Sequence, residues 1–252
     1  ILLCRTIDMP RSYLFAHPED VLDEMTLERF DNVIARRVEG EPMAYIMGVK
    51  EFWSHELAVS PATLVPRPET ELLVDLALRE IPRKAEWDVL DLGTGSGAIA
   101  VAIANERAMC RITAVDISEE ALAVARENVR NLSLGNIELA QGNWTAPVRG
   151  RTFNVIVSNP PYVRSDDAAL SKLQHEPQSA LAACIDGLAA SRVLAADCGV
   201  LLADDCVLLV ELGAEHNDDV AALLEKHGWT DIFCHNDLAG HPRVTVARQG
   251  GK

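Results

Sequence analysis

The sequence lacks the features that mark exported, membrane-spanning and zinc-binding proteins. None of its six cysteines (Cys4, Cys110, Cys184, Cys198, Cys206 and Cys234) lies in a C-x-x-C pair, so there is no local signature of a zinc site. No apolar run reaches the roughly 18 residues that a membrane-spanning helix needs. No basic segment followed by an apolar one opens the chain. We therefore expect a cytoplasmic protein with reduced, mostly buried thiols, no metal site and no membrane partner.

Basic residues are also scarce. The chain has 23 Lys and Arg against 38 Asp and Glu, which gives a formal net charge of -15. Nucleic-acid binding draws most of its affinity from Lys and Arg on phosphates, so this charge disfavours direct contact with nucleic acid without excluding a local basic patch. A basic protein partner fits the charge better.

The chain does not start with Met. Its first residues, Ile1-Leu2-Leu3, have the character of the interior of an apolar helix, so we expect a further N-terminal piece before them. Thr26 can cap a helix that ends before Gly40 and Pro42. The apolar residues of that helix, at helical spacing, are Leu27, Phe30, Ile34 and Val38. We expect residues 1–50 to form a small helical domain, truncated at its start.

At 252 residues, the chain is long enough for one catalytic domain beside this small unit. From residue 51 to residue 68, apolar residues alternate loosely with polar residues and prolines, which predicts a β-hairpin connector over residues 51–70. A helix is expected at residues 69–79. Strands and helices then alternate: strands are expected at 88–92, 111–117, 137–140, 153–158, 207–211, 232–234 and 243–247, and helices at 98–105, after a Ser118 cap, and at 218–227.

This alternation predicts an α/β fold over residues 71–252, in which helices cover both faces of a parallel sheet. Ligands of such sheets bind beyond the carboxyl ends of the strands. The chemistry of the protein is therefore expected in the loops that follow the strands.

A glycine-rich segment follows the first of these strands. Gly93, Thr94, Gly95, Ser96 and Gly97 lie before a helix, where glycine permits positive φ and lets the backbone approach a ligand. The helix N-terminus beyond them offers free N–H groups to an anion. Asp116 ends the second strand, near the usual position of a carboxylate that binds ribose hydroxyls. Together these residues favour a nucleoside-containing cofactor.

The glycine loop alone leaves the cofactor open. Gly93, Gly95 and Ala98 also satisfy the G-x-G-x-x-A pattern of nicotinamide-binding enzymes, and a tight turn without a ligand would use the same glycines. Taken by itself, Asp116 fits a solvated acid at a strand end as well as it fits a ligand contact.

The element that decides the class of enzyme is Asn159-Pro160-Pro161-Tyr162, which directly follows the fourth strand. The two prolines cannot donate ladder hydrogen bonds, so strand pairing stops and a stiff loop begins. The Asn159 side-chain oxygen and the Pro160 carbonyl are two acceptors that can hold both hydrogens of a planar –NH2 group. Such a nitrogen is a poor nucleophile, and holding it in line with a methyl donor lets catalysis be mostly positioning. A dehydrogenase has no use for paired acceptors here, although an ordinary Asn-Pro turn would have the same residues.

These residues, with Asn143-Trp144, resemble the class I methyltransferases that act on planar nitrogens. Adenine-N6 methyltransferases share the Pro-Pro-Tyr loop, so the loop alone gives only this class. Further segments closely resemble the release-factor glutamine N5-methyltransferases (HemK/PrmC type), and the resemblance spans nearly the whole chain. These segments are residues 40–45 with Gly48, Glu51-Phe52-Trp53, residues 60–71, His175-Glu176-Pro177 and Ala180-Leu181.

The resemblance implies a Rossmann-like sheet, mostly parallel with an antiparallel last strand, and S-adenosyl-L-methionine as the cofactor. It implies methylation of the glutamine in the Gly-Gly-Gln motif of a peptide chain release factor. The family's cofactor-binding positions match Gly93, Thr94, Gly95, Ser96, Gly97, Asp116, Trp144 and Asn159. Its substrate-binding positions match Asn159, Pro160, Pro161 and Tyr162, of which Asn159 and Pro160 would be catalytic. The family also places residues 66–71 near the active site.

Two other interpretations fit part of the sequence: an adenine-N6 methyltransferase acting on RNA or DNA, and a cofactor-binding interaction protein without catalysis. The acidic charge and the proline-rich connector disfavour the first, and the intact Asn159 and glycine loop disfavour the second. The chain departs from the family at Asp204-Asp205-Cys206, where the family has two glycines in the turn before the fifth strand.

Overall fold

The computed structural model describes residues 1–249, except for the side chains of residues 204–206. Its centre is a seven-stranded sheet of order β5-β4-β3-β6-β7-β9-β8. The strands are β3 Asp88–Leu92, β4 Arg111–Asp116, β5 Ile137–Gln141, β6 Phe153–Ser158, β7 Leu202–Glu211, β8 Trp229–Asn236 and β9 Pro242–Gln249. β9 is antiparallel to both of its neighbours, and the pairs from β5 to β7 are parallel. The expected α/β fold with an antiparallel last strand is confirmed.

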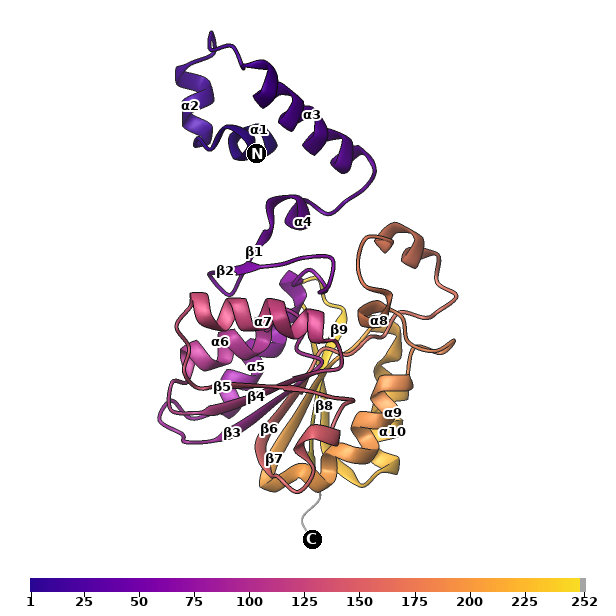
Figure 1. The fold of residues 1–252 in the computed structure, drawn as a ribbon. Helices are drawn as coiled ribbons and strands as arrows, with labels where there is room; N and C mark the ends of the chain where they lie inside the picture. Colours follow the sequence, from indigo (N-terminus) through magenta and orange to yellow (C-terminus); the bar gives the residue numbers. More distant parts are fainter. Residues whose placement is uncertain (250–252) are drawn as a thin grey trace.

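Helices cover both faces of this sheet (Figure 1). One face packs against α5 Glu71–Glu80, α6 Ala98–Glu106 and α7 Glu119–Asn131, and the other against α9 Ala189–Asp197 and α10 Asn217–Lys226. The strands are apolar on both sides because both sides are covered: Val89 and Leu90 point to opposite faces of β3, and both are fully buried.

Short elements make up the remaining connections. They are η1 Pro68–Thr70, η2 Ala146–Val148, η3 Ala168–Leu173, α8 Gln178–Leu181, η4 Cys198–Leu201 and η5 Ala214–His216. The fifth strand of the alternation begins at Leu202, earlier than the expected Val207, because Leu202 pairs with Phe153 before a register shift. Residues 204–206, expected as a turn, fall within the bounds of β7, and their side chains, that of Cys206 included, lie outside the described residues.

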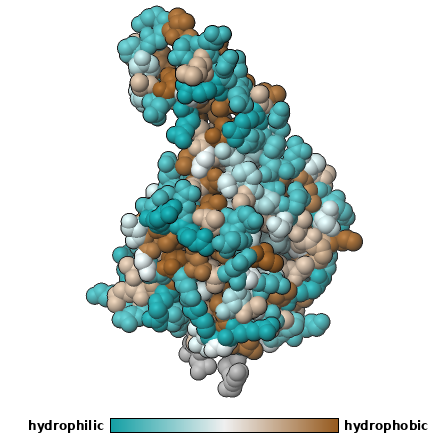
Figure 2. Space-filling model, viewed as in Figure 1, coloured by the Kyte–Doolittle hydropathy of each residue, from teal (hydrophilic) through white to brown (hydrophobic). Residues whose placement is uncertain are grey.

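The N-terminal helices project from the sheet domain and join it through a narrow neck (Figures 1 and 2). They are α1 Leu2–Ile7, α2 Arg11–Ala16, α3 Glu24–Val38 and α4 Met43–Met47. The prediction that Thr26 caps α3 is wrong: the cap is Asp23, whose carboxylate accepts a 2.7 Å hydrogen bond from the Thr26 N–H. A carboxylate is the stronger cap here because it also interacts favourably with the positive end of the helix dipole. Thr26 instead lies inside the first turn.

A two-stranded hairpin, β1 Val49–Phe52 and β2 His55–Ala58, connects the helical unit to the sheet domain. The buried side chain of Asn128 on α7 fixes it. Its oxygen accepts from the Ala58 N–H at 2.7 Å, and its nitrogen donates to the carbonyls of Ala58 and Ser96. Asn128 thereby ties the connector to the glycine loop, which contains Ser96.

Among residues 1–249, no helix is both long enough and apolar enough to cross a lipid bilayer. The five cysteines with described side chains are free thiols, and two of them, Cys110 and Cys198, are buried.

Candidate active site

The order of the strands defines where a ligand can bind. β3 lies between β4 and β6, so the chain turns to opposite sides of β3 after successive crossovers, and the strand ends splay apart at this point. The glycine loop follows β3 and the Asn159 loop follows β6. Leu92 pairs with Ser158, which makes Gly93 and Asn159 neighbours. A Cβ at Gly93 would lie only 3.9 Å from the Asn159 carbonyl oxygen.

The glycine loop is held tightly against β4. The N–H groups of Gly93 and Thr94 both donate to the Val115 carbonyl, at 2.9 and 3.0 Å. Gly93, Gly95 and Gly97 all have positive φ, between 56° and 82°, which glycine alone adopts without strain. Gly97 opens α6, and a Cβ there would come within 3.3 Å of the Ala125 Cβ on α7.

Asp116 at the end of β4 contributes to the shape of the same loop. One carboxylate oxygen accepts from the Gly95 N–H at 2.8 Å, and the other accepts from the Ser118 N–H at 3.0 Å. Ser118 in turn caps α7, as predicted, by accepting from the Ala121 N–H. The carboxylate therefore anchors the loop as well as lining the pocket beside it.

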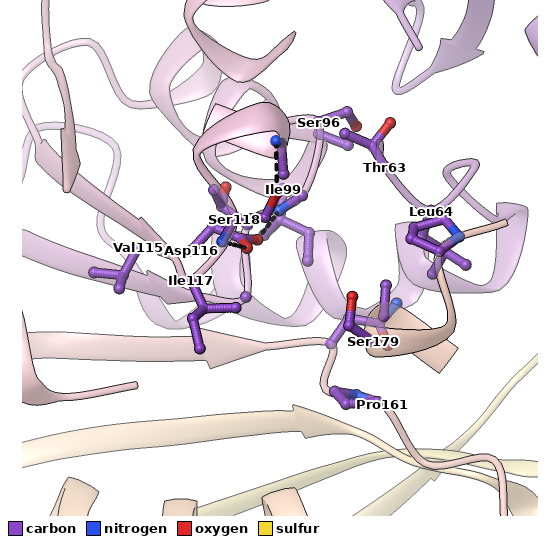
Figure 3. Close-up of a pocket in the computed structure, with 18 of the residues that line it drawn as sticks. Thr63, Leu64, Ser96, Ile99, Val115, Asp116, Ile117, Ser118, Pro161 and Ser179 are labelled. Atoms are coloured by element: carbon purple, nitrogen blue, oxygen red, sulfur yellow. Dashed lines mark hydrogen bonds between the residues drawn. The ribbon is translucent and has the colours of Figure 1, made fainter. Parts of the chain in front are cut away.

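A pocket opens between these two loops, and Figure 3 shows its walls: Asp116, Ile117 and Ser118 lie on one side, and Leu64, Pro161 and Ser179 on the other. Of the residues expected to bind cofactor or substrate, those that line it are Gly93, Thr94, Gly95, Ser96, Asp116, Trp144, Asn159 and Pro161. Gly97, Pro160 and Tyr162 are not among its lining residues. The structure thus brings most of the predicted site together. Gly97 lies behind the loop as a helix cap, Pro160 is buried between the lining residues Asn159 and Pro161, and Tyr162 is turned away.

The pocket fits a nucleoside-containing cofactor on its glycine side. At Gly95 an added Cβ would meet nothing within 4 Å, so the backbone there faces open space along the pocket wall. Beneath the loop, the Asp91 carboxylate accepts from the Thr94 hydroxyl at 2.6 Å. Burial raises the pKa of Asp91 to about 7, so this acid supports the loop from a fully buried position.

The Asn159 loop is fixed by side chains that the sequence did not single out. The Asn159 Nδ2 donates to the Thr70 hydroxyl oxygen at 3.1 Å, and the Tyr162 hydroxyl donates to Glu211 Oε1 at 3.4 Å. Burial raises the pKa of Tyr162 to about 12, which keeps the phenol protonated at neutral pH. Thr70 lies in the segment that the resemblance places near the site, whereas nothing in the sequence marks Glu211 except an acid ending an apolar strand.

An ion pair between the buried Glu176 and the partly exposed Arg67 lies at the far wall of the pocket. Glu176 is 4% exposed and accepts from the Arg67 guanidinium at 2.5 Å and from the Val65 N–H at 3.0 Å. Arg67 lines the pocket. Next to it, His175 Nε2 lies 3.0 Å from the Glu39 carbonyl oxygen of the helical unit. The sequence indicated both segments only through resemblance, and their contact comes from the fold.

The fold and the pocket at its switch point define a class I methyltransferase. Residues 69–183 match the family model described as "Methyltransferase small domain", and residues 1–48 match "PrmC N-terminal domain".

Curated relatives give the family within this class. The release factor glutamine methyltransferase of Vibrio cholerae is 43% identical over 251 residues, which cover 98% of this chain and 87% of that protein. The protein of the same name from Pseudomonas aeruginosa is 44% identical, over 98% of this chain and 90% of that protein. A methyltransferase from Pyrococcus furiosus shares the fold, with a TM-score of 0.59 and 20% identity over 86% of this chain and 97% of that one. The chain belongs to the release factor glutamine methyltransferase family.

Proposed function

We propose that this protein uses S-adenosyl-L-methionine to methylate the side-chain nitrogen N5 of the glutamine in the Gly-Gly-Gln motif of a peptide chain release factor. The observation that carries the proposal is the Asn159 carboxamide. It sits at the pocket wall beside Gly93, with its nitrogen occupied by Thr70 and its oxygen left for another partner. Membership of the family supports the choice of substrate.

We assign the cofactor to the glycine side of the pocket. The backbone of residues 93–97 would approach the cofactor closely, Asp116 would accept from its ribose hydroxyls, and Trp144 would lie against its base. When bound there, the cofactor supplies an electrophilic methyl group on a sulfonium. The residues of the chain bind the substrate amide and orient it toward this methyl group.

The Asn159 oxygen and the Pro160 carbonyl accept the two N–H bonds of the glutamine carboxamide. These two hydrogen bonds orient the nitrogen and raise its electron density. An amide nitrogen is only weakly nucleophilic, so most of the rate gain comes from holding it in line. Pro160 and Pro161 keep both acceptors fixed, which avoids reorganisation during the reaction. The amide proton leaves late, once methyl transfer has made the nitrogen acidic, and passes to water.

The partner of this site is the release factor itself. A protein with net charge -15 attracts a basic protein surface and repels phosphate backbones, so direct nucleic-acid contact plays no part in the proposal. We place the reaction in the cytoplasm, and we assign the chain to three units: residues 1–50, 51–70 and 71–252.

Mass spectrometry of a release factor incubated with this protein and S-adenosyl-L-methionine tests the proposal. We expect one added methyl group on the glutamine of the Gly-Gly-Gln peptide and none on a release factor whose glutamine is replaced by glutamate. RNA and DNA offered in parallel should stay unmodified. Methylated adenine with an unmodified release factor would instead support the adenine-N6 interpretation.

Asn159→Ala tests the role of the loop in the same assay. We expect transfer to slow by about 100-fold or more, as when a fixed oxygen or nitrogen partner of a reacting group is removed. Cofactor affinity should be largely kept. Asn131→Ala, at the exposed end of α7, is the matched control and should leave both unchanged. An equal loss of cofactor affinity in Asn159→Ala would show that the residue serves the cofactor instead.

A further inference from the structure

A carboxamide side chain has two different ends, and only one of them serves this reaction. The substrate glutamine presents N–H donors at its nitrogen, so Asn159 must face it with Oδ1, the acceptor, and not with Nδ2. The two ends have nearly the same shape, so packing alone discriminates poorly between the two orientations. A hydrogen-bond partner behind Asn159 must therefore select one of the two orientations. In this structure that partner is the Thr70 hydroxyl, 3.1 Å from Nδ2.

Thr70 selects the orientation only if its oxygen accepts. A hydroxyl carries one proton, which it can give either to Asn159 or to another group. Thr70 is 4% exposed and lies at the end of η1, directly before α5. Behind it lies Glu211, the last residue of β7, which is 1% exposed. The Thr70 hydroxyl lies near enough to the Glu211 carboxyl group to lower its pKa, although the two form no hydrogen bond in this structure, so the Glu211 charge favours a Thr70 proton turned toward it.

Glu211 is placed to act as an acceptor. Its Oε1 receives the Tyr162 hydroxyl at 3.4 Å, and its Oε2 has no hydrogen-bond partner among the described residues. An ionised carboxylate has no proton to donate, so the Tyr162 hydroxyl donates to it, and the same negative charge favours a Thr70 proton turned away from Asn159. The Thr70 oxygen is then free to accept from Asn159. Tyr162, which does not line the pocket, gains a role in this arrangement.

We propose that Thr70 is the positioning residue for Asn159: its hydroxyl oxygen accepts from Nδ2 and fixes the Asn159 carboxamide with Oδ1 toward the pocket, and the charge of the nearby Glu211 supports Thr70 in this role. The inference rests on the proposed role of Asn159 in holding the substrate amide. Without the Thr70 acceptor the carboxamide can turn over and present its NH2 group to the NH2 group of the substrate. Two donors then face each other, and the methyl acceptor is no longer held.

The first test compares isosteric and conservative variants of Thr70. Thr70→Val keeps the shape and removes the hydroxyl, and we expect kcat to fall by about 10-fold to 100-fold, the worth of one or two buried hydrogen bonds. Affinity for S-adenosyl-L-methionine should change by less than about 3-fold, since cofactor binding does not depend on which end of the carboxamide faces the substrate. Thr70→Ser keeps the hydroxyl and should restore kcat to near the wild-type value.

Thr113→Val is the matched control. Thr113 is 2% exposed on β4, away from the pocket, and its hydroxyl oxygen also accepts a buried hydrogen bond, from Arg151 at 2.8 Å. We expect this variant to lose stability comparable to Thr70→Val without losing kcat. Equal kcat in the two valine variants would overturn the proposal. So would a Thr70→Ser variant as slow as Thr70→Val, or a loss confined to cofactor affinity.

A second measurement does not depend on the folding of a Thr70 variant. Burial raises the pKa of Glu211 to about 7, and the groups that face it are Thr70, Arg243 and Tyr162, which lower its pKa, and Glu69, which raises it. The positioning form is the carboxylate, so the kcat of the wild-type enzyme should fall as pH drops below about 7. Glu211→Gln cannot titrate there and can donate to Thr70. We expect its kcat to be low and flat between about pH 6 and 8. An unchanged acid limb in Glu211→Gln would overturn the proposal.

The outcome separates this inference from the proposed function. If the release factor is never methylated, the function has failed. If the release factor is methylated and kcat is indifferent to Thr70 and Glu211, only the positioning inference has failed.

Discussion

Asp116 and Gly95 are joined by a 2.8 Å hydrogen bond from the glycine N–H to the carboxylate, across two loops that leave neighbouring strands. The acid that sequence patterns assign to the ribose of a cofactor therefore also sets the conformation of the loop that would meet the cofactor's other atoms. We propose that cofactor binding and the conformation of the glycine loop both depend on this side chain.

Removing this carboxylate should weaken the cofactor more than it weakens the fold. We expect Asp116→Ala to raise the Kd for S-adenosyl-L-methionine by about 10-fold to 100-fold, through lost contacts and a loosened loop. Isothermal titration calorimetry measures the change. Asp88→Ala, at the opposite end of the sheet and paired with Arg111 on the surface, is the control and should bind as wild type does. Equal affinity in both variants would remove Asp116 from the cofactor site.

Alanine substitutions at two glycines with positive φ distinguish an effect on stability from an effect on cofactor binding. Gly95 has φ 56° and Gly48 has φ 75°, and an added Cβ would meet nothing within 4 Å at either position. Alanine should cost about 1 kcal/mol of stability at each, because an L residue is strained at positive φ. Only Gly95→Ala places a methyl group in the pocket, so only it should lower cofactor affinity. Thermal denaturation with and without the cofactor measures both effects; equal cofactor-induced stabilisation of the two variants would contradict the assignment.

The pair of Arg67 and Glu176 is only partly buried, since the Arg67 side chain is 35% exposed. Glu176→Ala leaves the Val65 N–H without its acceptor, whereas the Arg67 guanidinium keeps access to water, and we expect the free energy of unfolding to fall by about 1–2 kcal/mol. The exposed pair of Arg79 and Asp75 provides the comparison, since Asp75→Ala should cost less than about 0.5 kcal/mol. Chemical denaturation measures both. A similar cost for the two variants would show that the pair is not a structural clamp.

Asp91 should make stability depend on pH in a definite direction. Burial raises its pKa to about 7, against roughly 3.9 in the unfolded chain. Between these values the folded state binds a proton that the unfolded state releases. The stability that protonated Asp91 contributes is therefore greatest at about pH 4, falls as pH rises, and levels off above about pH 7. We expect the stability of wild type relative to Asp91→Asn to fall by roughly 1–4 kcal/mol over this range. A flat or rising difference in denaturation experiments at several pH values would contradict the buried acid.

Local patterns predicted most elements of the sheet domain, although they missed α9 and placed the start of β7 at Val207. The expected strands at 88–92 and 153–158 have the observed bounds, and Ser118 caps α7 as predicted. These elements are short apolar runs between strong turn residues, so their limits are encoded where they occur. The cap of α3 was missed because Asp23 and Thr26 are both good capping residues, and the choice between them depends on where the first helical hydrogen bond forms.

The site divides in the same way. The glycines at 93, 95 and 97 and the Pro-Pro pair can be recognised from the sequence, because each is required by its own backbone conformation. The supporting side chains cannot be recognised in this way. Glu211 lies 52 positions after Asn159 in the sequence. Both residues lie near Thr70 only because β6, β7 and the start of α5 meet at one edge of the sheet.

By itself the sequence determined the class of fold, the family and the two loops to which we assign the chemistry, since these depend on local backbone requirements and on motifs contiguous in the chain. Only the tertiary structure decided which end of the Asn159 carboxamide faces the pocket, that Tyr162 turns to Glu211, and that Glu176 pairs with Arg67. Those outcomes are contacts between segments far apart in sequence, and their geometry is fixed by the packing of the sheet and its helices.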